Sequence, residues 1–188
     1  MIHEISNRLK SLATLDAIVC PDWEFRYFSY NSQWSEGEEM GSLRDGSGGQ
    51  WFFWKKGELA GYKCISPEDG VVEYISDHFK DIPSSYNSFI NEPAFSMLDS
   101  SCVWYLMDNN WIKLGVDIKH VLTLEKVISW EPINYKEWAE EYYEENLDLE
   151  AISHIFTGNI NVSHITSLNP DVEMSELTTE LEEIGMAL

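Results

Sequence analysis

Hydrophobic residues near the start of the chain recur at helical spacing. They are Ile2, Ile5, Leu9, Leu12 and Leu15, which fall on one face of a helix. Similar spacing predicts helices over residues 134–146, 162–168 and 175–184. Ser175 is the expected N-cap of the last helix, and Gly185 is expected at its end.

Alternating and aromatic runs predict strands. Residues 23–30 alternate, with Trp23, Phe25 and Tyr27 on one side, and predict a strand. The aromatic run 51–54, a turn at 55–58 and the run 59–65 predict a hairpin. Residues 102–107 and 111–114 predict a second hairpin around an Asp-Asn-Asn turn.

The remaining segments complete an α+β order. Residues 31–50 predict a polar loop, and short helices are expected near 71–80 and from Pro83, the latter with Tyr86, Phe89 and Ile90 inside. Residues 120–129 and 149–156 fit either a helix or a strand. We therefore expect an antiparallel sheet built from hairpins with helices packed on one face or end. The 188 residues contain no repeat or obvious linker, so a single domain over 1–188 is expected.

Charge narrows the possible functions. Asp and Glu number 33 against 12 Lys and Arg, a net charge of −21. Such a surface repels nucleic acid and anionic membranes, so we expect it to bind neither. After Lys136 the chain has no Lys or Arg, while 13 carboxylates follow. This end is either a solvated face that keeps the protein soluble or a docking surface for a basic protein partner.

Cysteines and histidines show no recognisable chemical motif. Cys20, Cys64 and Cys102 are far apart, and the latter two are expected to pack as small hydrophobes. The histidines form neither HxH nor HExxH, so we predict no metal site, no cofactor and no catalytic residue. His154 and His164 would meet if residues 155–163 turn back, and a structural role is the favoured one. With no secretion signal and no apolar run near the roughly 20 residues of a membrane span, a cytoplasmic protein is expected.

The loop at 36–50 is the candidate for ligand contact. Its glycines at 46, 48 and 49 precede a strand-like run, whereas phosphate loops follow a strand and open a helix. A flexible connection between strands is therefore the simpler interpretation. Glycine loops on rigid scaffolds also contact ligands, which makes Arg44, Asp45, Ser47 and Trp51 candidate ligand contacts.

The predicted helix at 134–146 is the candidate for partner binding. Tyr135, Trp138 and Tyr142 form an aromatic stripe, and glutamates occupy much of the remaining surface. The stripe either faces the core or, if exposed among carboxylates, suits a partner with basic and aromatic groups. The candidate partner-binding residues are Tyr135, Trp138, Glu141, Tyr142 and Glu145.

Two resemblances to known families bear on function. Residues 15–24 (LDAIVCPDWE), 40–48 (MGSLRDGSG) and 91–97 (NEPAFSM) resemble a family of uncharacterised bacterial proteins, which has no known activity to transfer. Residues 83–90 (PSSYNSFI) resemble the Pro-x-x-Tyr-x-x-Phe-[Leu/Ile] helix of SUKH-type immunity proteins of bacterial toxin systems. In that superfamily the helix lies near the N-terminus and leads into Asn-Gly-Gly, whereas here it lies mid-chain and leads into Asn91-Glu92-Pro93.

Together these features favour a non-enzymatic acidic binding protein that docks a basic protein partner, as a toxin-immunity protein does. One alternative is a small-ligand-binding protein or an enzyme that uses the 36–50 loop. Another is a structural domain without a dedicated site.

Overall fold

The structure, a computed structural model, describes residues 1–73 and 75–188. The chain folds into two compact units, which are described separately. Unit 1 comprises Met1–Gln33 and Leu124–Leu188, and unit 2 comprises Trp34–Thr123. The expectation of one domain stays a prediction.

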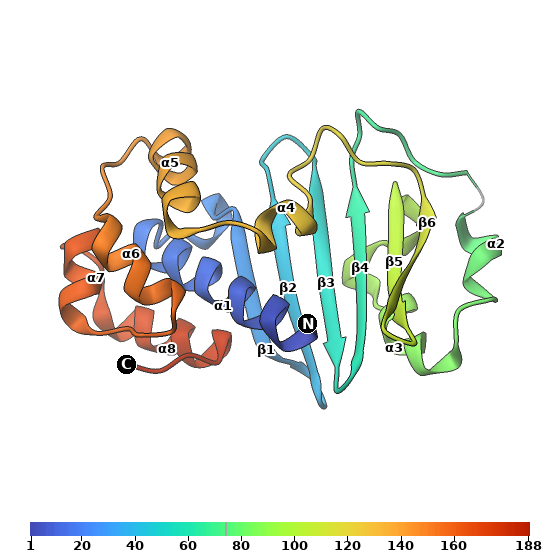
Figure 1. The fold of residues 1–188 in the computed structure, drawn as a ribbon, viewed down its shortest axis with the longest axis horizontal. Helices are drawn as coiled ribbons and strands as arrows, with labels where there is room; N and C mark the ends of the chain where they lie inside the picture. The colour runs from blue at the N-terminus through green and yellow to red at the C-terminus, as the bar shows by residue number, and fades with distance from the viewer. Residues whose placement is uncertain (74) are drawn as a thin grey trace. The chain divides into compact units, whose positions relative to one another are not determined.

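The helical elements occupy mainly the beginning and the last third of the chain (Figure 1). The α-helices are α1 (Ile2–Val19), α2 (Ile75–Phe79), α3 (Asn87–Ile90), α4 (Leu124–Ile128), α5 (Pro132–Tyr143), α6 (Leu149–Phe156), α7 (Val162–Leu168) and α8 (Met174–Ile184). The short 3₁₀ turns are η1 (Trp23–Phe25), η2 (Ser84–Tyr86), η3 (Pro93–Phe95) and η4 (Met97–Asp99). No helix within the described residues is long and apolar enough to cross a membrane.

Six strands form one antiparallel sheet, in which the strand order follows the sequence (Figure 1). They are β1 (Phe28–Ser35), β2 (Glu38–Arg44), β3 (Gln50–Lys56), β4 (Leu59–Ile65), β5 (Cys102–Met107) and β6 (Asn110–Gly115). Short turns join successive strands except between β4 and β5, where α2 and α3 are inserted. The α+β prediction is therefore confirmed.

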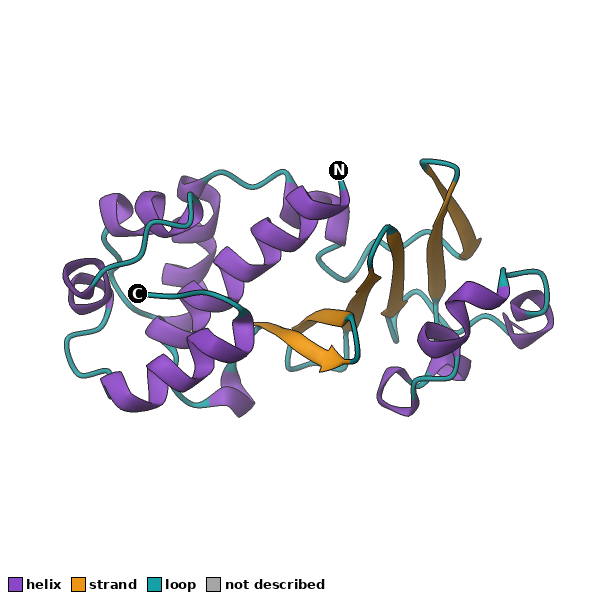
Figure 2. Ribbon diagram, turned by 90° about the horizontal axis from the view of Figure 1, so that it is seen from below, coloured by secondary structure: helices purple, strands orange, loops and turns teal. Residues whose placement is uncertain are grey.

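The core of unit 2 lies on one face of its strands. Phe52, Trp54, Val103 and Tyr105 point to this face. The helices α2 and α3 and the turns η2, η3 and η4 cover it, and helical segments lie along one side of these strands in Figure 2. The covering residues include Ile75, Ile82, Tyr86, Phe89, Phe95 and Met97. Gly61 lets this layer come close, because a Cβ at that position would lie 2.6 Å from the Phe89 ring. The predicted inward direction of Tyr86 and Phe89 is confirmed.

The core of unit 1 is mainly helical. One face of α1 is buried, and α6 and α8 pack against it. The inner residues of those helices are aliphatic, namely Ile152, Ile155, Leu177, Leu181 and Ile184. The ambiguous segment 149–156 is therefore a helix, and 124–128 is one as well.

The structure corrects the expected organisation of residues 23–50. The predicted strand at 23–30 is wrong over its first half, because Trp23–Phe25 form a 3₁₀ turn and the strand begins at Phe28. The predicted loop at 31–50 is wrong as well, since it contains the end of β1 and the whole of β2.

Smaller differences concern individual helices. The N-cap of α8 is Glu173 rather than Ser175, and its carboxylate accepts from the Ser175 N–H. The expected end at Gly185 is confirmed, because this residue has a left-handed φ of 81°. The predicted helix at 71–80 is shorter, from Ile75 to Phe79, and position 74 lies outside the described residues.

Candidate functional site

A short segment of unit 1, residues 21–25, holds exposed aromatic side chains on a tightly fastened backbone. We call it the aromatic turn; it contains Pro21, Asp22, Trp23, Glu24 and Phe25. It leaves the end of α1 and leads through Arg26 into β1. The Phe25 N–H donates to the Asp22 carbonyl over 3.1 Å, which closes a single 3₁₀ turn.

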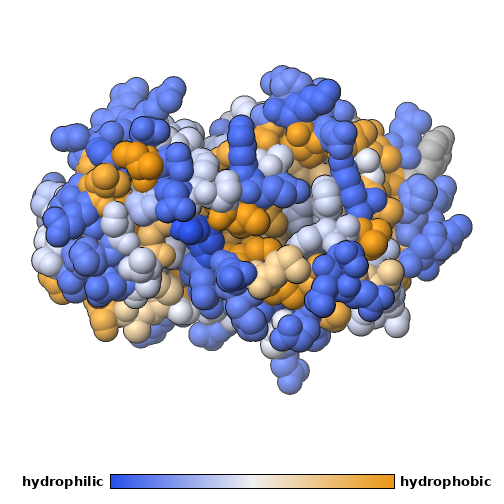
Figure 3. Space-filling view, viewed as in Figure 1, coloured by the Kyte–Doolittle hydropathy of each residue, from blue (hydrophilic) through white to orange (hydrophobic). Residues whose placement is uncertain are grey.

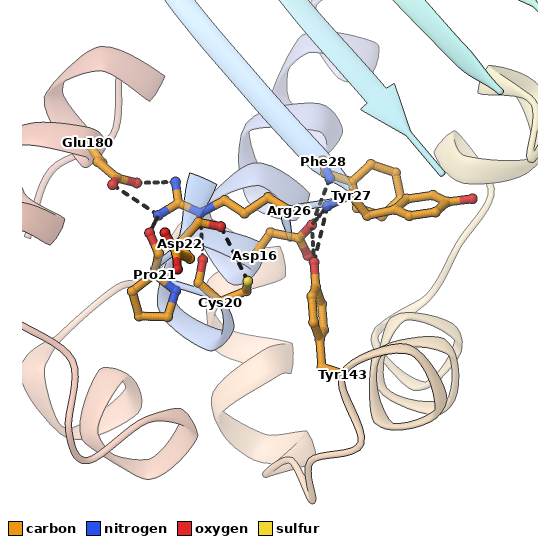
Figure 4. A network of polar contacts seen from close by, with 9 residues as sticks. All are labelled: Asp16, Cys20, Pro21, Asp22, Arg26, Tyr27, Phe28, Tyr143 and Glu180. Carbon is orange, nitrogen blue, oxygen red and sulfur yellow. Dashed lines mark hydrogen bonds and ion pairs between the residues drawn. The ribbon is translucent and has the colours of Figure 1, made fainter. Parts of the chain in front are cut away.

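The side chain of Arg26, the residue after the turn, bonds back to the start of the turn (Figure 4). Its Nε donates to the Cys20 carbonyl at 2.6 Å and its Nη2 to the Pro21 carbonyl at 2.5 Å. The same guanidinium forms a bidentate ion pair with Glu180 of α8, in which Nη2–Oε1 is 2.9 Å. Because the side chain of Arg26 is almost fully buried, these bonds are shielded from water and the turn is tied to α8.

Asp16 of α1 fastens the chain just beyond the turn. Its Oδ2 accepts from the N–H groups of Tyr27 and Phe28, at 3.1 and 2.7 Å, and from the Tyr143 hydroxyl at 2.8 Å (Figure 4). Its Oδ1 accepts from the Tyr135 hydroxyl at 2.8 Å. A buried carboxylate that accepts four hydrogen bonds replaces its lost hydration with fixed donors.

Burial has the largest effect on the pKa of Asp16. It raises the pKa of Asp16 to about 6, and the four hydrogen bonds oppose the rise. Burial and the adjacent Asp16 charge raise the pKa of Tyr135 and of Tyr143, so both phenols remain protonated donors. At neutral pH the carboxylate is ionised and joins α1, β1 and α5.

The two aromatic residues of the turn face solvent. Trp23 is 53% exposed and Phe25 is 61% exposed. Large aromatic side chains are the residues most often found at the energetic centre of protein interfaces. Since the backbone that holds them is hydrogen-bonded before and after the turn, this backbone loses little conformational entropy on binding.

The helix α5 places the predicted partner-binding residues at different depths. Tyr135 is fully buried beneath Asp16, and Trp138 is half-buried among six aromatic rings. Tyr142 is 39% exposed and stacks on Trp138 with ring centres 5.3 Å apart. Glu141 is exposed on the helix, and Glu145 is exposed just beyond its end. Tyr135 thus supports the site from within, while the partner role of the other residues stays a prediction.

Positive and negative charges of unit 1 lie at different depths. The unit has 19 acidic and 5 basic residues, a net charge of −14, and of its basic residues only Lys126 is exposed. Arg8 lies over the Phe156 ring at 4.5 Å, and Lys136 forms an ion pair with Glu140. Hydrophilic residues accordingly cover much of the face over α6 and α7 in Figure 3, with hydrophobic residues between them near α5. The exposed field of unit 1 is therefore almost purely negative.

The predicted ligand loop belongs to unit 2 and is organised by its own aspartate. The Asp45 carboxylate accepts from the N–H groups of Ser47 and Gly49, each at 2.8 Å, which closes the turn between β2 and β3. Arg44 is half-buried at the end of β2, and Ser47 is exposed at the tip. Trp51 is fully buried, and its indole N–H donates to the Leu122 carbonyl at 2.9 Å. A ligand-binding role for this loop stays a prediction.

The predicted proximity of two histidines is confirmed. His154 and His164 do meet, with stacked rings whose centres are 4.5 Å apart. Their neighbours are Asn159 and Asn161, which hydrogen-bond the rings as a structural role requires. Among the described residues no group of three or more His, Cys, Asp or Glu could hold a metal ion.

Comparison with protein-family models, with curated proteins and with solved structures found no match to this chain. The two resemblances noted in the sequence therefore remain predictions, and the site must be interpreted from its own geometry.

The aromatic turn was not predicted from the sequence, because Trp23, Phe25 and Tyr27 alternate with charged residues as in a strand. One local signal pointed the other way. Pro21 followed by Asp22 favours the start of a helical turn rather than of a strand.

Proposed function

We propose that this chain is a non-enzymatic binding protein that docks a basic protein partner through the aromatic turn of unit 1. The exposure of Trp23 and Phe25 on a turn fastened by Arg26 and Asp16 carries the proposal. A buried bidentate arginine and a buried carboxylate are costly to desolvate. Here they hold a turn whose aromatic side chains remain more than half exposed.

The surrounding charge indicates the chemistry of the partner. Asp22 and Glu24 are exposed within the turn itself, and unit 1 carries a net charge of −14. The C-terminal end of α5 reaches the same place, since the Tyr27 N–H lies 3.2 Å from the Tyr143 hydroxyl. A surface of this kind attracts a partner rich in Lys and Arg and favours rapid association with it. A toxin of the kind that immunity proteins neutralise is one partner with this chemistry.

Affinity capture with matched variants tests the proposal. The full chain is immobilised and incubated with an extract of the source cells, beside Trp23→Ala/Phe25→Ala and the control Leu98→Ala/Met107→Ala. The control removes two exposed apolar side chains of unit 2, which are 67% and 41% exposed. We expect wild type and control to retain the same basic protein in near-equimolar amount, and the turn variant to retain at least about tenfold less.

Salt provides the second criterion. Capture should fall when salt rises from about 0.05 to about 0.5 M, because the attraction is screened. The proposal fails if wild type retains no partner in near-equimolar amount, or if the turn variant retains that partner as well as the control does.

A further inference from the structure

Cys64 and Cys102 lie directly opposite each other on neighbouring strands of unit 2. The register of β4 and β5 pairs these two residues, so both side chains point to the same face of the sheet. Both are fully buried, the Cys64 thiol interacts with that of Cys102, and it also donates to the Ile65 carbonyl at 3.7 Å. Facing Cα atoms in antiparallel strands are about 4.5–5.5 Å apart, a separation that a disulfide spans. The backbone is therefore already placed for an S–S bond.

We propose that Cys64 and Cys102 form an oxidation site, at which a peroxide converts the two thiols into a cross-strand disulfide. In the first step one thiolate sulfur attacks the peroxide, the O–O bond breaks, and a sulfenic acid forms as hydroxide leaves. The second thiol then attacks that sulfur and expels water. The sum is two thiols and one hydrogen peroxide giving one disulfide and two waters, with sulfur oxidised and oxygen reduced by two electrons.

The surroundings make this oxidation slow at neutral pH. The hydrogen bond with Cys102 and then burial raise the pKa of the Cys64 thiol far above its ordinary value. The thiolate is the reactive form, so its scarcity limits the first step. As long as the pH is below the thiol pKa, the oxidation rate should therefore rise about tenfold for each unit by which the pH increases.

Cys102 lies on the strand next to the sheet edge. Cys102 faces Gly115 on β6, which is the last strand of the sheet. A Cβ at Gly115 would come within 2.8 Å of the Cys102 Cα, so a glycine allows the close approach of these strands. Edge strands open more readily than central ones, and opening of β6 would expose Cys102 to a molecule as small as hydrogen peroxide.

The product would join the neighbouring strands β4 and β5, which lie on either side of the long insertion in unit 2. The bond closes a loop over residues 65–101, which contains α2 and α3. Closing a loop of this length restricts the unfolded chain and stabilises the fold. The oxidised protein should therefore unfold several degrees above the reduced protein.

Peroxide treatment of the full-length protein tests the site. The Cys20→Ser variant is used beside wild type, because it leaves only the paired cysteines and alters a half-buried position. After hydrogen peroxide treatment under native conditions, remaining thiols are trapped with N-ethylmaleimide in denaturant and peptides are mapped by mass spectrometry. We expect peptides linked through Cys64 and Cys102, formed about tenfold faster at one pH unit higher and reversed by dithiothreitol.

Three results would overturn the proposal. The first is that both Cys64 and Cys102 are still free thiols after native peroxide treatment, so that N-ethylmaleimide modifies them completely. The second is linkage that appears only when denaturant is present during oxidation. The third is oxidation to sulfinic acid at either cysteine without linkage. The Cys64→Ala variant serves as a further control, since its unfolding temperature should not respond to peroxide.

Discussion

Lys63 in unit 2 and Asp16 in unit 1 are buried ionisable residues whose surroundings strongly affect the stability of the fold. Lys63 is fully buried in unit 2, where its ammonium donates to the Phe95 carbonyl and lies 5.8 Å from the centre of the Phe52 ring. Burial lowers the pKa of Lys63 to about 8, and the charge of Asp99 opposes this. Below that pH the folded protein holds a charge that water would solvate better.

Replacing Lys63 by Met should remove a pH dependence of stability. The unfolded chain keeps the lysine proton up to about pH 10.5 and the folded chain only up to about 8. Between these values the unfolded state binds more protons, so the free energy of unfolding of wild type rises with pH, by about 3 kcal/mol in total. Urea unfolding at a series of pH values should show this rise in wild type and not in Lys63→Met.

The control for this measurement is Lys80→Met, at an exposed lysine of the same unit, which should keep the rise. If the free energy of unfolding of Lys63→Met rose with pH as in wild type, a group other than Lys63 would be responsible for the pH dependence. At pH 7 the Met variant should be at least as stable as wild type, because the unpaired Phe95 carbonyl costs about 1 kcal/mol and the removed charge costs more.

Asp16→Asn should destabilise unit 1. An amide offers one acceptor oxygen, and its NH₂ group would face N–H or O–H donors that now bond to the carboxylate. Buried donors without acceptors cost about 1–3 kcal/mol. The loss is partly offset because the burial that raises the pKa of Asp16 also makes its charge costly, so a net loss of unfolding free energy of about 1 kcal/mol is expected in urea. Asp22→Asn, an exposed carboxylate six residues later, should change stability by less than about 0.5 kcal/mol. Equal effects of the two changes would contradict the role of the four hydrogen bonds.

At the scale of elements, the aromatic turn depends on contacts outside itself. It is a single 3₁₀ turn, which is too short to be stable alone. Arg26 joins it to the end of α1 and to Glu180 of α8, and Asp16 fixes the start of β1. The turn is therefore formed by the packing of three elements around it.

Arg26→Lys should loosen this turn more than it lowers global stability. A single ammonium cannot replace the planar guanidinium fork that reaches two carbonyls and a carboxylate together. Hydrogen exchange followed by mass spectrometry should show the amides of Phe25 and Arg26 exchanging at least about tenfold faster, while α6 keeps its protection. Glu180→Gln keeps the fork and both carbonyl bonds, so it should have a smaller effect. Unchanged exchange in Arg26→Lys would contradict the fastening role.

At the scale of the whole molecule, the net charge of −21 opposes folding. Unit 1 contributes −14 of it and unit 2 contributes −7. Carboxylates that repel each other in the compact state separate when the chain unfolds. The folded protein keeps this unfavourable repulsion, as expected if the negative charge serves to attract a partner.

Salt should therefore stabilise the folded protein. Raising sodium chloride from about 0.01 to about 0.3 M shortens the Debye length from about 30 to about 6 Å, which screens this repulsion. The thermal unfolding midpoint should rise by several degrees. The variant Glu141→Lys/Glu145→Lys replaces two exposed negative charges by positive ones and should show a smaller rise. An equal rise in both proteins would mean that salt acts on something other than this field.

Elements with a local residue pattern could be predicted from the sequence alone. The first helix, both hairpins of the 51–65 and 102–114 regions and the α+β class follow from spacing, turns and aromatic runs. The stretch after Lys136 without any Lys or Arg is equally visible in the sequence. These features depend on residues close together in the chain, so a short window contains their causes.

The conformation between Trp23 and Gln50, in contrast, depends on long-range contacts. Glu38 and Glu39 make β2 look like a polar loop, yet they face Lys56 and Lys55 across the β2–β3 register and form ion pairs with them. Glu38 also accepts from the Trp54 indole N–H at 2.7 Å, so its carboxylate is buried with partners. Likewise Asp16 and Arg26 are charges that a pattern places at the surface, whereas Glu180 and the tyrosines of α5 allow them to be buried. Whether a charged side chain can be buried depends on partners that are distant in the sequence, and a short sequence window does not contain these partners.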